Sequence, residues 1–227
     1  MTRLVRIPLR VANSYLVIGE KTIIVDTGDP GYAKGILRAL SKEKIDRRDV
    51  SLIFITHGHI DHFGSVFELK RSIDAPIVIQ RHDEPYLNRG VQGPLYAKNR
   101  LAAFMKRIGG NFSVPKRYGF TADLTFDHQM DLQPYGVEGE LIATPGHTLG
   151  SASLVLADGR AIVGDLLVRR YFLAGPPAIP PFLQDGRAFY ESIRRLDELG
   201  VHSYYPGHGG QIKREEFSLK SNSNLRL

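Results

Sequence analysis

The chain alternates short apolar runs with longer amphipathic stretches. The apolar runs end at glycine, proline or polar residues, which is typical of buried β-strands, and the longer stretches have the apolar spacing of helices. The sequence predicts strands near residues 14–18, 22–25, 51–56, 76–80, 139–143, 152–156 and 160–164. It predicts amphipathic helices near residues 31–41, 62–72 and 186–199.

The segment 82–130 interrupts this pattern and is predicted to be a helical insertion. Its best helix lies around 95–108 and ends at Gly109-Gly110. The flanking parts are two similar halves, each with strands followed by helices. Two such halves predict an α/β fold, a four-layer α/β/β/α sandwich, in one domain that spans residues 1–227.

The composition is compatible with a large core in one domain and excludes several kinds of chemistry. Of 227 residues, 42% are hydrophobic and none is cysteine, which rules out disulfides, a cysteine nucleophile and thiolate metal sites. Residues 1–8 lack the apolar core of a signal peptide, and no apolar run has the length of a membrane span. We therefore expect a soluble, cytoplasmic protein with no membrane partner.

The net charge of +6 allows two interpretations. A basic protein can bind nucleic acid, or it can attract a small anionic substrate. The basic residues are spread along the chain and mostly alternate with acids, as on solvated helix faces. This pattern favours a small-molecule substrate, possibly anionic, over a nucleic-acid partner.

A polar tract follows the strand near 51–56 and contains four residues of metal-ligand type: His57-Gly58-His59-Ile60-Asp61-His62. Imidazole and carboxylate groups bind zinc and neighbouring first-row metals. Side chains at positions i and i+2 of an extended segment point the same way, so His57 and His59 can converge on one ion. If a helix begins directly after His59, Asp61 and His62 point elsewhere and can begin a second site.

Three later segments offer further candidate ligands, namely His147, Asp165 and His208. Each follows a predicted strand and stands next to glycine or proline in a turn. Binding residues are expected on such loops at the ends of a rigid scaffold. Together with the first tract they indicate a metal centre assembled from both halves of the chain.

With these motifs, the chain resembles the metallo-β-lactamase-fold hydrolases over nearly its whole length. The opening hairpin and Asp-Thr-Gly turn, the histidine tract and the later metal motifs occur in the family's order, at residues 13–18, 22–28, 56–62, 146–148, 164–165 and 207–209. The Asp61-His62 pair and this order of ligands are closest to the glyoxalase II-like branch. The longer C-terminal helical region of glyoxalase II itself is not found, so glutathione thioesters are not the expected substrate.

The resemblance implies two divalent metal ions. One is held by His57, His59 and His147 and the other by Asp61, His62 and His208, with Asp165 bridging the two. Zinc is the expected metal, with iron or manganese as alternatives.

The implied activity is hydrolysis of a small-molecule ester, thioester, lactone or phosphoester by a metal-activated hydroxide. Asp165 fixes the distance between the metals, and Asp61 helps to orient the hydroxide. Asp26 has two equally open interpretations. It either holds the second ring nitrogen of a ligand histidine or caps a turn.

Rival activities remain open. A mononuclear iron persulfide dioxygenase would share four of these ligands, and some relatives of this fold are nucleases. A non-catalytic metal-binding module needs fewer ligands than the seven present.

Substrate choice is predicted to lie in two segments that form a lid. They are 82–130, with Tyr86, Tyr96, Phe104, Met105 and Phe112, and 168–182, with Arg169, Arg170 and Tyr171. An arginine here would meet a substrate carboxylate or phosphate. His82, His128 and His202 lack a metal motif and are left out of the site.

Overall fold

The computed structural model describes residues 2–109, 120–169 and 175–217, and its strands form two six-stranded sheets. The first sheet contains, in spatial order, β1 (Arg3–Pro8), β2 (Asn13–Ile18), β3 (Thr22–Val25), β4 (Val50–Ile55), β5 (Ile77–Gln80) and β6 (Leu124–Phe126). The second contains β14 (Ile212–Lys213), β13 (Ser203–Pro206), β10 (Arg160–Gly164), β9 (Ala152–Leu156), β8 (Gly139–Ala143) and β7 (Gln129–Asp131). A small separate pair joins β11 (Val168–Arg169) to β12 (Pro177–Ala178).

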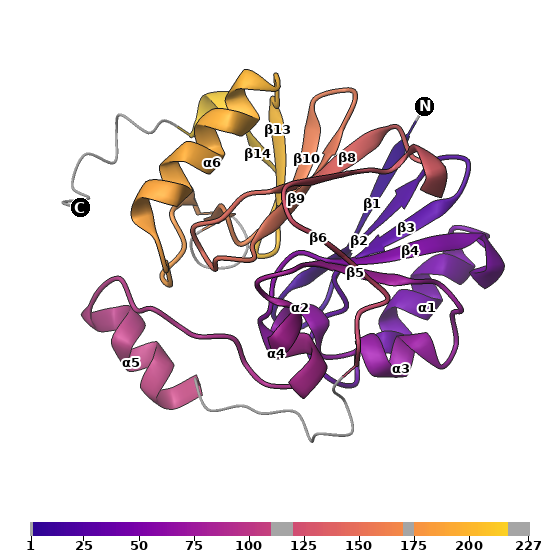
Figure 1. Ribbon diagram of the computed structural model, residues 1–227, viewed down its shortest axis with the longest axis horizontal. Coiled ribbons are helices and arrows are strands. Elements are labelled where there is room, and N and C mark those ends of the chain that lie inside the picture. The colour runs from indigo at the N-terminus through magenta and orange to yellow at the C-terminus, as the bar shows by residue number, and fades with distance from the viewer. Residues whose placement is uncertain (1, 110–119, 170–174, 218–227) are drawn as a thin grey trace.

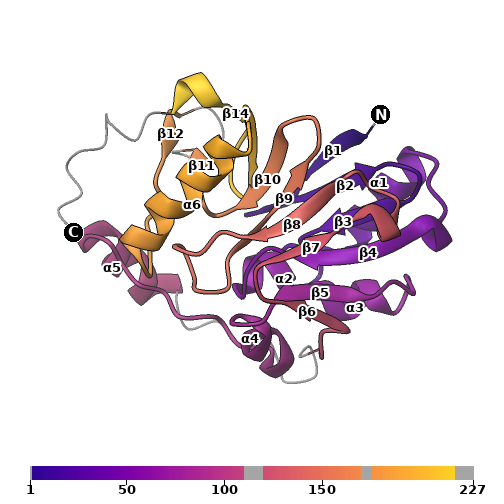
Figure 2. The same cartoon turned by 45° about the horizontal axis from the view of Figure 1, so that its top comes forward.

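Helices cover the outer faces of the two sheets (Figures 1 and 2). The helices described are α1 (Ala33–Lys42), α2 (Ile60–Phe63), α3 (Val66–Lys70), α4 (Glu84–Arg89), α5 (Arg100–Gly109) and α6 (Gly186–Glu198). Helices α1 and α3 lie on the first sheet, and α6 lies on the second.

Three apolar clusters separate the four layers. Ile36 and Leu69 belong to the cluster between the helices and the first sheet, and Phe54 and Leu154 to the cluster between the two sheets. Ile193 of α6 belongs to the third cluster, on the outer face of the second sheet. The predicted α/β/β/α sandwich is therefore confirmed.

Strand β4 is apolar without interruption over residues 52–55, and its packing gives the reason. Leu52 and Phe54 point between the sheets, whereas Ile53 and Ile55 point toward the helices. The strand pairs in parallel with β3 and β5, and parallel strands are commonly covered on both faces. Because neither face meets water, no polar residue alternates in the run that leads into the histidine tract.

The predicted helix near 62–72 is instead two short helices, α2 and α3. At the break, the Ser65 amide donates to the Gly28 carbonyl (3.2 Å) and the Ser65 hydroxyl donates to the Asp29 carbonyl. A Cβ at Gly64 would lie 2.5 Å from Pro30. These contacts with the turn after β3 divide the helix.

The predicted helical insertion 82–130 is helical only in its first part, where α4 and α5 lie. Its last residues form β6 and β7, which extend one sheet each. Each of these strands has only three residues, too few to give a clear alternation. The edge strand β1 was not expected either, because its exposed Arg3 and Arg6 interrupt its apolar pattern.

Within the described residues, no helix has the length and hydropathy needed to cross a lipid bilayer.

Candidate metal centre

The seven candidate ligands meet at one edge of the two sheets. Each follows the carboxyl end of a strand, so the scaffold brings together residues that are far apart in the chain. His57 and His59 follow β4, Asp61 and His62 lie on α2, and β8, β10 and β13 lead into His147, Asp165 and His208. Their donor atoms form three overlapping groups that could each hold a metal ion.

The first group consists of three buried histidines from two loops. His59 Nδ1 lies 3.1 Å from His57 Nε2 and 2.9 Å from His147 Nε2. All three residues are at most 3% exposed. Their ring nitrogens thus converge on one point from both sheets.

The second group combines a carboxylate with two histidines. Asp61 Oδ2 lies 3.3 Å from His208 Nε2 and 3.8 Å from His62 Nε2. Gly207 makes room for this group, since a Cβ there would lie 2.5 Å from the His62 ring.

Asp165 contacts both groups. Its Oδ1 lies 3.4 Å from His62 Nε2, and its Oδ2 lies 3.3 Å from His208 Nε2 and 3.6 Å from His147 Nε2. One carboxylate therefore faces donor atoms of the first and of the second group.

The outward ring nitrogen of every one of these five histidines faces a hydrogen-bond acceptor. The pairs are His57 Nδ1 with Thr56 Oγ1 (3.0 Å), His59 Nε2 with Pro94 O (3.4 Å), His62 Nδ1 with Asp26 Oδ2 (2.7 Å), His147 Nδ1 with Phe182 O (2.8 Å) and His208 Nδ1 with Val11 O (3.0 Å). Each outward nitrogen therefore carries a hydrogen, and in a neutral imidazole the inward nitrogen presents a lone pair.

This arrangement fits a bound cation. Two lone pairs that face each other, as in His57 and His59, cannot form a hydrogen bond. His62 Nε2 and Asp165 Oδ1 are buried and make no hydrogen bond within the protein. A divalent ion would satisfy these atoms, and a set of imidazole and carboxylate donors suits zinc, iron or manganese.

The pKa shifts divide the cluster into a neutral and a charged part. Burial, together with His147, lowers the pKa of His59 to about 3, and burial also lowers the pKa of His57. Burial acts in the same direction on His62 and His208, but neighbouring carboxylates outweigh it. Asp26 and Asp165 raise the pKa of His62, and Asp165 raises the pKa of His208 to about 10. The carboxylate side of the cluster thus strongly favours positive charge.

Asp26 holds the ring of a candidate ligand, so of its two interpretations the structure supports this one. Its Oδ2 accepts hydrogen bonds from His62 Nδ1 and from Thr56 Oγ1 (2.8 Å), and its Oδ1 accepts one from the Thr56 amide (2.8 Å). The Thr56 hydroxyl in turn accepts from His57. Asp26 therefore orients one histidine of each group, and Thr56 is a contributor that sequence reasoning missed.

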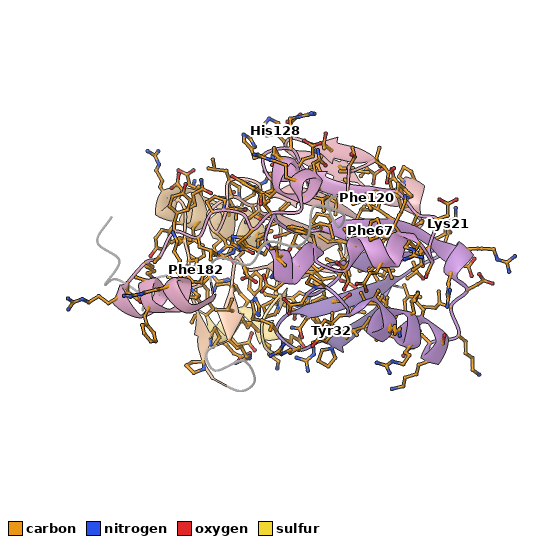
Figure 3. The ribbon with its side chains drawn as sticks, turned by 90° about the horizontal axis from the view of Figure 1, so that it is seen from below. Lys21, Tyr32, Phe67, Phe120, His128 and Phe182 are labelled. Atoms are coloured by element: carbon orange, nitrogen blue, oxygen red, sulfur yellow. The ribbon has the colours of Figure 1, made fainter. Side chains whose placement is uncertain are left out.

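The two predicted lid segments lie next to each other. Ala97 and Phe182 form an antiparallel bridge, and the Leu183 amide donates to the Tyr96 carbonyl (2.9 Å). Figure 3 shows Phe182 beside helix α5. The Pro94 carbonyl faces His59 and the Phe182 carbonyl faces His147, so each segment supports one histidine. Main-chain carbonyls occur at every position and give no sequence signal for such a role.

Arg169 does not offer its guanidinium to a substrate. It donates to the carbonyls of Gln211 (2.7 Å) and Gly175 (3.1 Å) and pairs with Glu216 (2.6 Å). The predicted contacts of Arg170, Tyr171 and Phe112 lie outside the described residues, as does the side chain of Met105. Tyr86 packs on Gly58 of the histidine tract, while Tyr96 and Phe104 are exposed.

The histidines left out of the prediction lie outside the cluster. His82 contacts Gln80, and His202 contacts the Ser203 hydroxyl and the Asp158 carbonyl. His128 is exposed in the turn between β6 and β7, at the outer edge of the molecule (Figure 3).

Comparison with known families identifies the class. The model of the metallo-beta-lactamase superfamily matches residues 7–208, so the chain belongs to this superfamily, as its motifs predicted.

Two curated relatives are 28% identical to this chain. One is the "Probable metallo-hydrolase MJ0888" of Methanocaldococcus jannaschii, where the match covers 91% of this chain and 92% of that protein. The other is the "Probable metallo-hydrolase YflN" of Bacillus subtilis, with coverages of 92% and 84%.

Solved structures share the fold at lower identity. The B3 metallo-β-lactamase BLEG-1 superposes with a TM-score of 0.67 at 20% identity, covering 94% of this chain and 95% of that one. TTHA1623, solved in a di-iron-bound form, gives a TM-score of 0.67 at 24% identity, with coverages of 99% and 100%.

Proposed function

We propose that the protein is a metal-dependent hydrolase with a dinuclear centre, which cleaves a small-molecule ester, thioester, lactone or phosphoester. The observation that carries this proposal is the overlap of the three donor groups: the group His57, His62 and Asp165 shares His57 with one neighbouring group and His62 with the other. Overlapping groups with a shared carboxylate suit two neighbouring ions better than one. The names of the two curated relatives support the hydrolase class.

We assign the first ion to His57, His59 and His147 and the second to Asp61, His62 and His208, with Asp165 shared by both. When bound, two such ions supply an activated water at neutral pH and polarise the scissile group. The Asp61-His62 pair and the order of the ligands favour the glyoxalase II-like branch of the superfamily. Zinc is the proposed metal, while iron or manganese would fit the same donors.

Asp61 is the most exposed of the seven side chains, at 26%, whereas Asp165 is 11% exposed. Asp61 can therefore accept a hydrogen bond from a water molecule and orient it. Asp165 contacts three histidines and is proposed to fix the distance between the two donor groups. The segments around Ala97 and Phe182 adjoin His59 and His147 through the Pro94 and Phe182 carbonyls, so an organic substrate is proposed to meet them there.

The second donor group argues against the mononuclear dioxygenase. A one-iron centre uses His57, His59, His147 and Asp165 and leaves the remaining three ligands without a role. Those three donors nevertheless lie within 4.8 Å of one another. A compact, partly buried group of this kind, next to the first, supports two ions.

The test is a metal-defined assay. The protein is loaded with zinc, manganese or iron, its metal content is measured, and it is offered lactones, thioesters, phosphodiesters and RNA. We expect two ions per chain, hydrolysis of at least one small-molecule class, and loss of both hydrolysis and bound metal in His59→Ala with the fold retained. One iron per chain with oxygen consumption on persulfides would overturn the proposal. RNA cleavage with a steep salt dependence would replace the small-molecule substrate.

A further inference from the structure

The carboxylate of Asp83 lies buried between the two loops that carry the first group of histidines. It is 1% exposed and stands between β5 and α4. Its Oδ2 accepts hydrogen bonds from the Gly58 amide (2.7 Å) and the Thr148 hydroxyl (2.7 Å), and its Oδ1 accepts one from the Gly150 amide (3.1 Å). Gly58 separates His57 from His59, and Thr148 directly follows His147.

These contacts indicate an ionised carboxylate. Burial raises the pKa of Asp83, and its hydrogen bonds with Thr148 and Gly58 offset only part of this rise, so the case for an ionised group rests on the geometry of its partners. The Gly58 amide, the Thr148 hydroxyl and the Gly150 amide all donate to Asp83. This matches an ionised carboxylate, which can only accept hydrogen bonds. A Cβ at Gly150 would lie 2.5 Å from the carboxylate, so the two loops close tightly around it.

The geometry of the first group requires such a connection. The loop with His57 and His59 extends from the first sheet, whereas the loop with His147 belongs to the second. Zinc–nitrogen bonds measure about 2.0–2.1 Å and tolerate deviations of only about 0.2 Å. Two loops from different sheets must therefore be held in register to a fraction of an ångström.

We propose that Asp83 is a positioning residue of the three-histidine site, which aligns the two ligand loops across the sheets by accepting hydrogen bonds from both. This inference rests on the proposed dinuclear centre. Its role differs from that of Asp26, which holds histidine rings within the first sheet directly or through Thr56. Asp83 acts on the backbone and on Thr148, and its negative charge adds to the attraction for a cation.

The direct test is Asp83→Asn, which keeps the side-chain volume but replaces an acceptor oxygen with an amide donor. The NH2 group of the new side chain would face a donor in either orientation. At the Oδ1 position it would face the Gly150 amide, and at the Oδ2 position the Gly58 amide and the Thr148 hydroxyl. We expect zinc affinity at one of the two sites to fall about 10–100-fold, as for other groups that orient ligands. Equilibrium dialysis with zinc measures both affinities, and the visible absorption of the cobalt-loaded protein reports the geometry. kcat should fall with little change in KM.

Asp197→Asn is the matched control, because Asp197 also accepts several hydrogen bonds, from Tyr204 (2.8 Å) and Arg214 (2.6 Å), away from the ligand loops. This variant should lower the melting temperature without changing metal affinity or the cobalt spectrum. A second pair uses Thr148: Thr148→Val removes one hydrogen bond to Asp83 and should weaken the same site, and Thr148→Ser should restore it.

Wild-type metal affinities and cobalt spectrum in Asp83→Asn would overturn the inference while leaving the proposed function intact. If that variant does not fold, equal metal affinities in Thr148→Val and Thr148→Ser would overturn it instead. Failure of the wild-type protein to bind two ions would remove the proposed function, and this inference with it.

Discussion

Two parts of the candidate metal centre are supported in different ways. His57 and His62 depend on the buried side chain of Asp26, directly or through Thr56, within the first sheet. His59 and His147 depend on main-chain carbonyls of the two lid segments. The first part is thus built by the core of the fold, whereas the second is completed by segments outside the sheets.

We expect this difference to have a functional consequence. A carbonyl moves only if its segment moves, so we expect a substrate that contacts the predicted lid segments to act also on the histidines that they support. The part that depends on Asp26 is insulated from such movement, because Asp26 is 1% exposed and bonded to Thr56. If the proposed centre binds metal and substrate, we expect substrate fit and metal geometry to be coupled mainly through His59 and His147.

The largest effect should come from Asp165→Ala, because this carboxylate contacts both parts. We expect loss of both ions and a fall in hydrolysis beyond the roughly 10–100-fold that is typical of residues that only orient a ligand. Elemental analysis and kinetic assays measure this, with Asp127→Ala as the control, an exposed carboxylate that pairs with Arg81. Loss of a single ion would contradict a shared carboxylate.

Metal removal should affect the two parts of the candidate metal centre differently. If the ions bind only the folded state, chelation at a metal concentration 100 times Kd removes about 2.7 kcal/mol of stability per ion and lowers the melting temperature. Hydrogen exchange should rise at the Leu183 and Lys98 amides, which join the lid segments, while the Thr56 amide stays protected by Asp26. Equal deprotection at all three amides would show that the proposed difference in support does not exist.

Asp26→Ala should weaken the binding of both ions, since Asp26 orients one histidine of each group. The expected loss is about 10–100-fold in metal affinity. Competition with a chelator of known affinity measures it, and Asp26→Asn serves as the variant of similar volume. A loss confined to one ion would show that the link through Thr56 to His57 has no effect.

The smallest effects should come from the glutamines that hold the lid segments. Gln92 Oε1 accepts a hydrogen bond from the Ile60 amide (3.0 Å), and Gln184 Oε1 accepts one from the Leu149 amide (3.0 Å). Gln92→Ala and Gln184→Ala each remove one neutral hydrogen bond, worth about 1 kcal/mol, or roughly a fivefold change in kcat/KM. Metal content should stay unchanged. A loss of metal in either variant would place the glutamines among the supports of the centre.

The fold could be predicted where an element is long and buried. The apolar run 52–55 within β4 and the helical periodicity of α6 were sufficient for their assignment. By contrast, β6 and β7 contain three residues each, and β1 carries arginines on an edge, so their pairing partners decide their structure. The helix after His59 is broken by contacts of Ser65 with the turn after β3, which lies more than 30 residues earlier.

The sequence by itself determined which residues can bind metal, because imidazole and carboxylate chemistry belongs to the residue type. It also determined that His57 and His59 lie on one side of the chain, because that follows from a two-residue spacing in extended backbone. Only the tertiary structure decided which donors share a group, which ring nitrogens face inward, and that Asp83 holds the two loops. The reason is physical: these properties depend on distances between loops of different sheets and on main-chain carbonyls that every residue possesses.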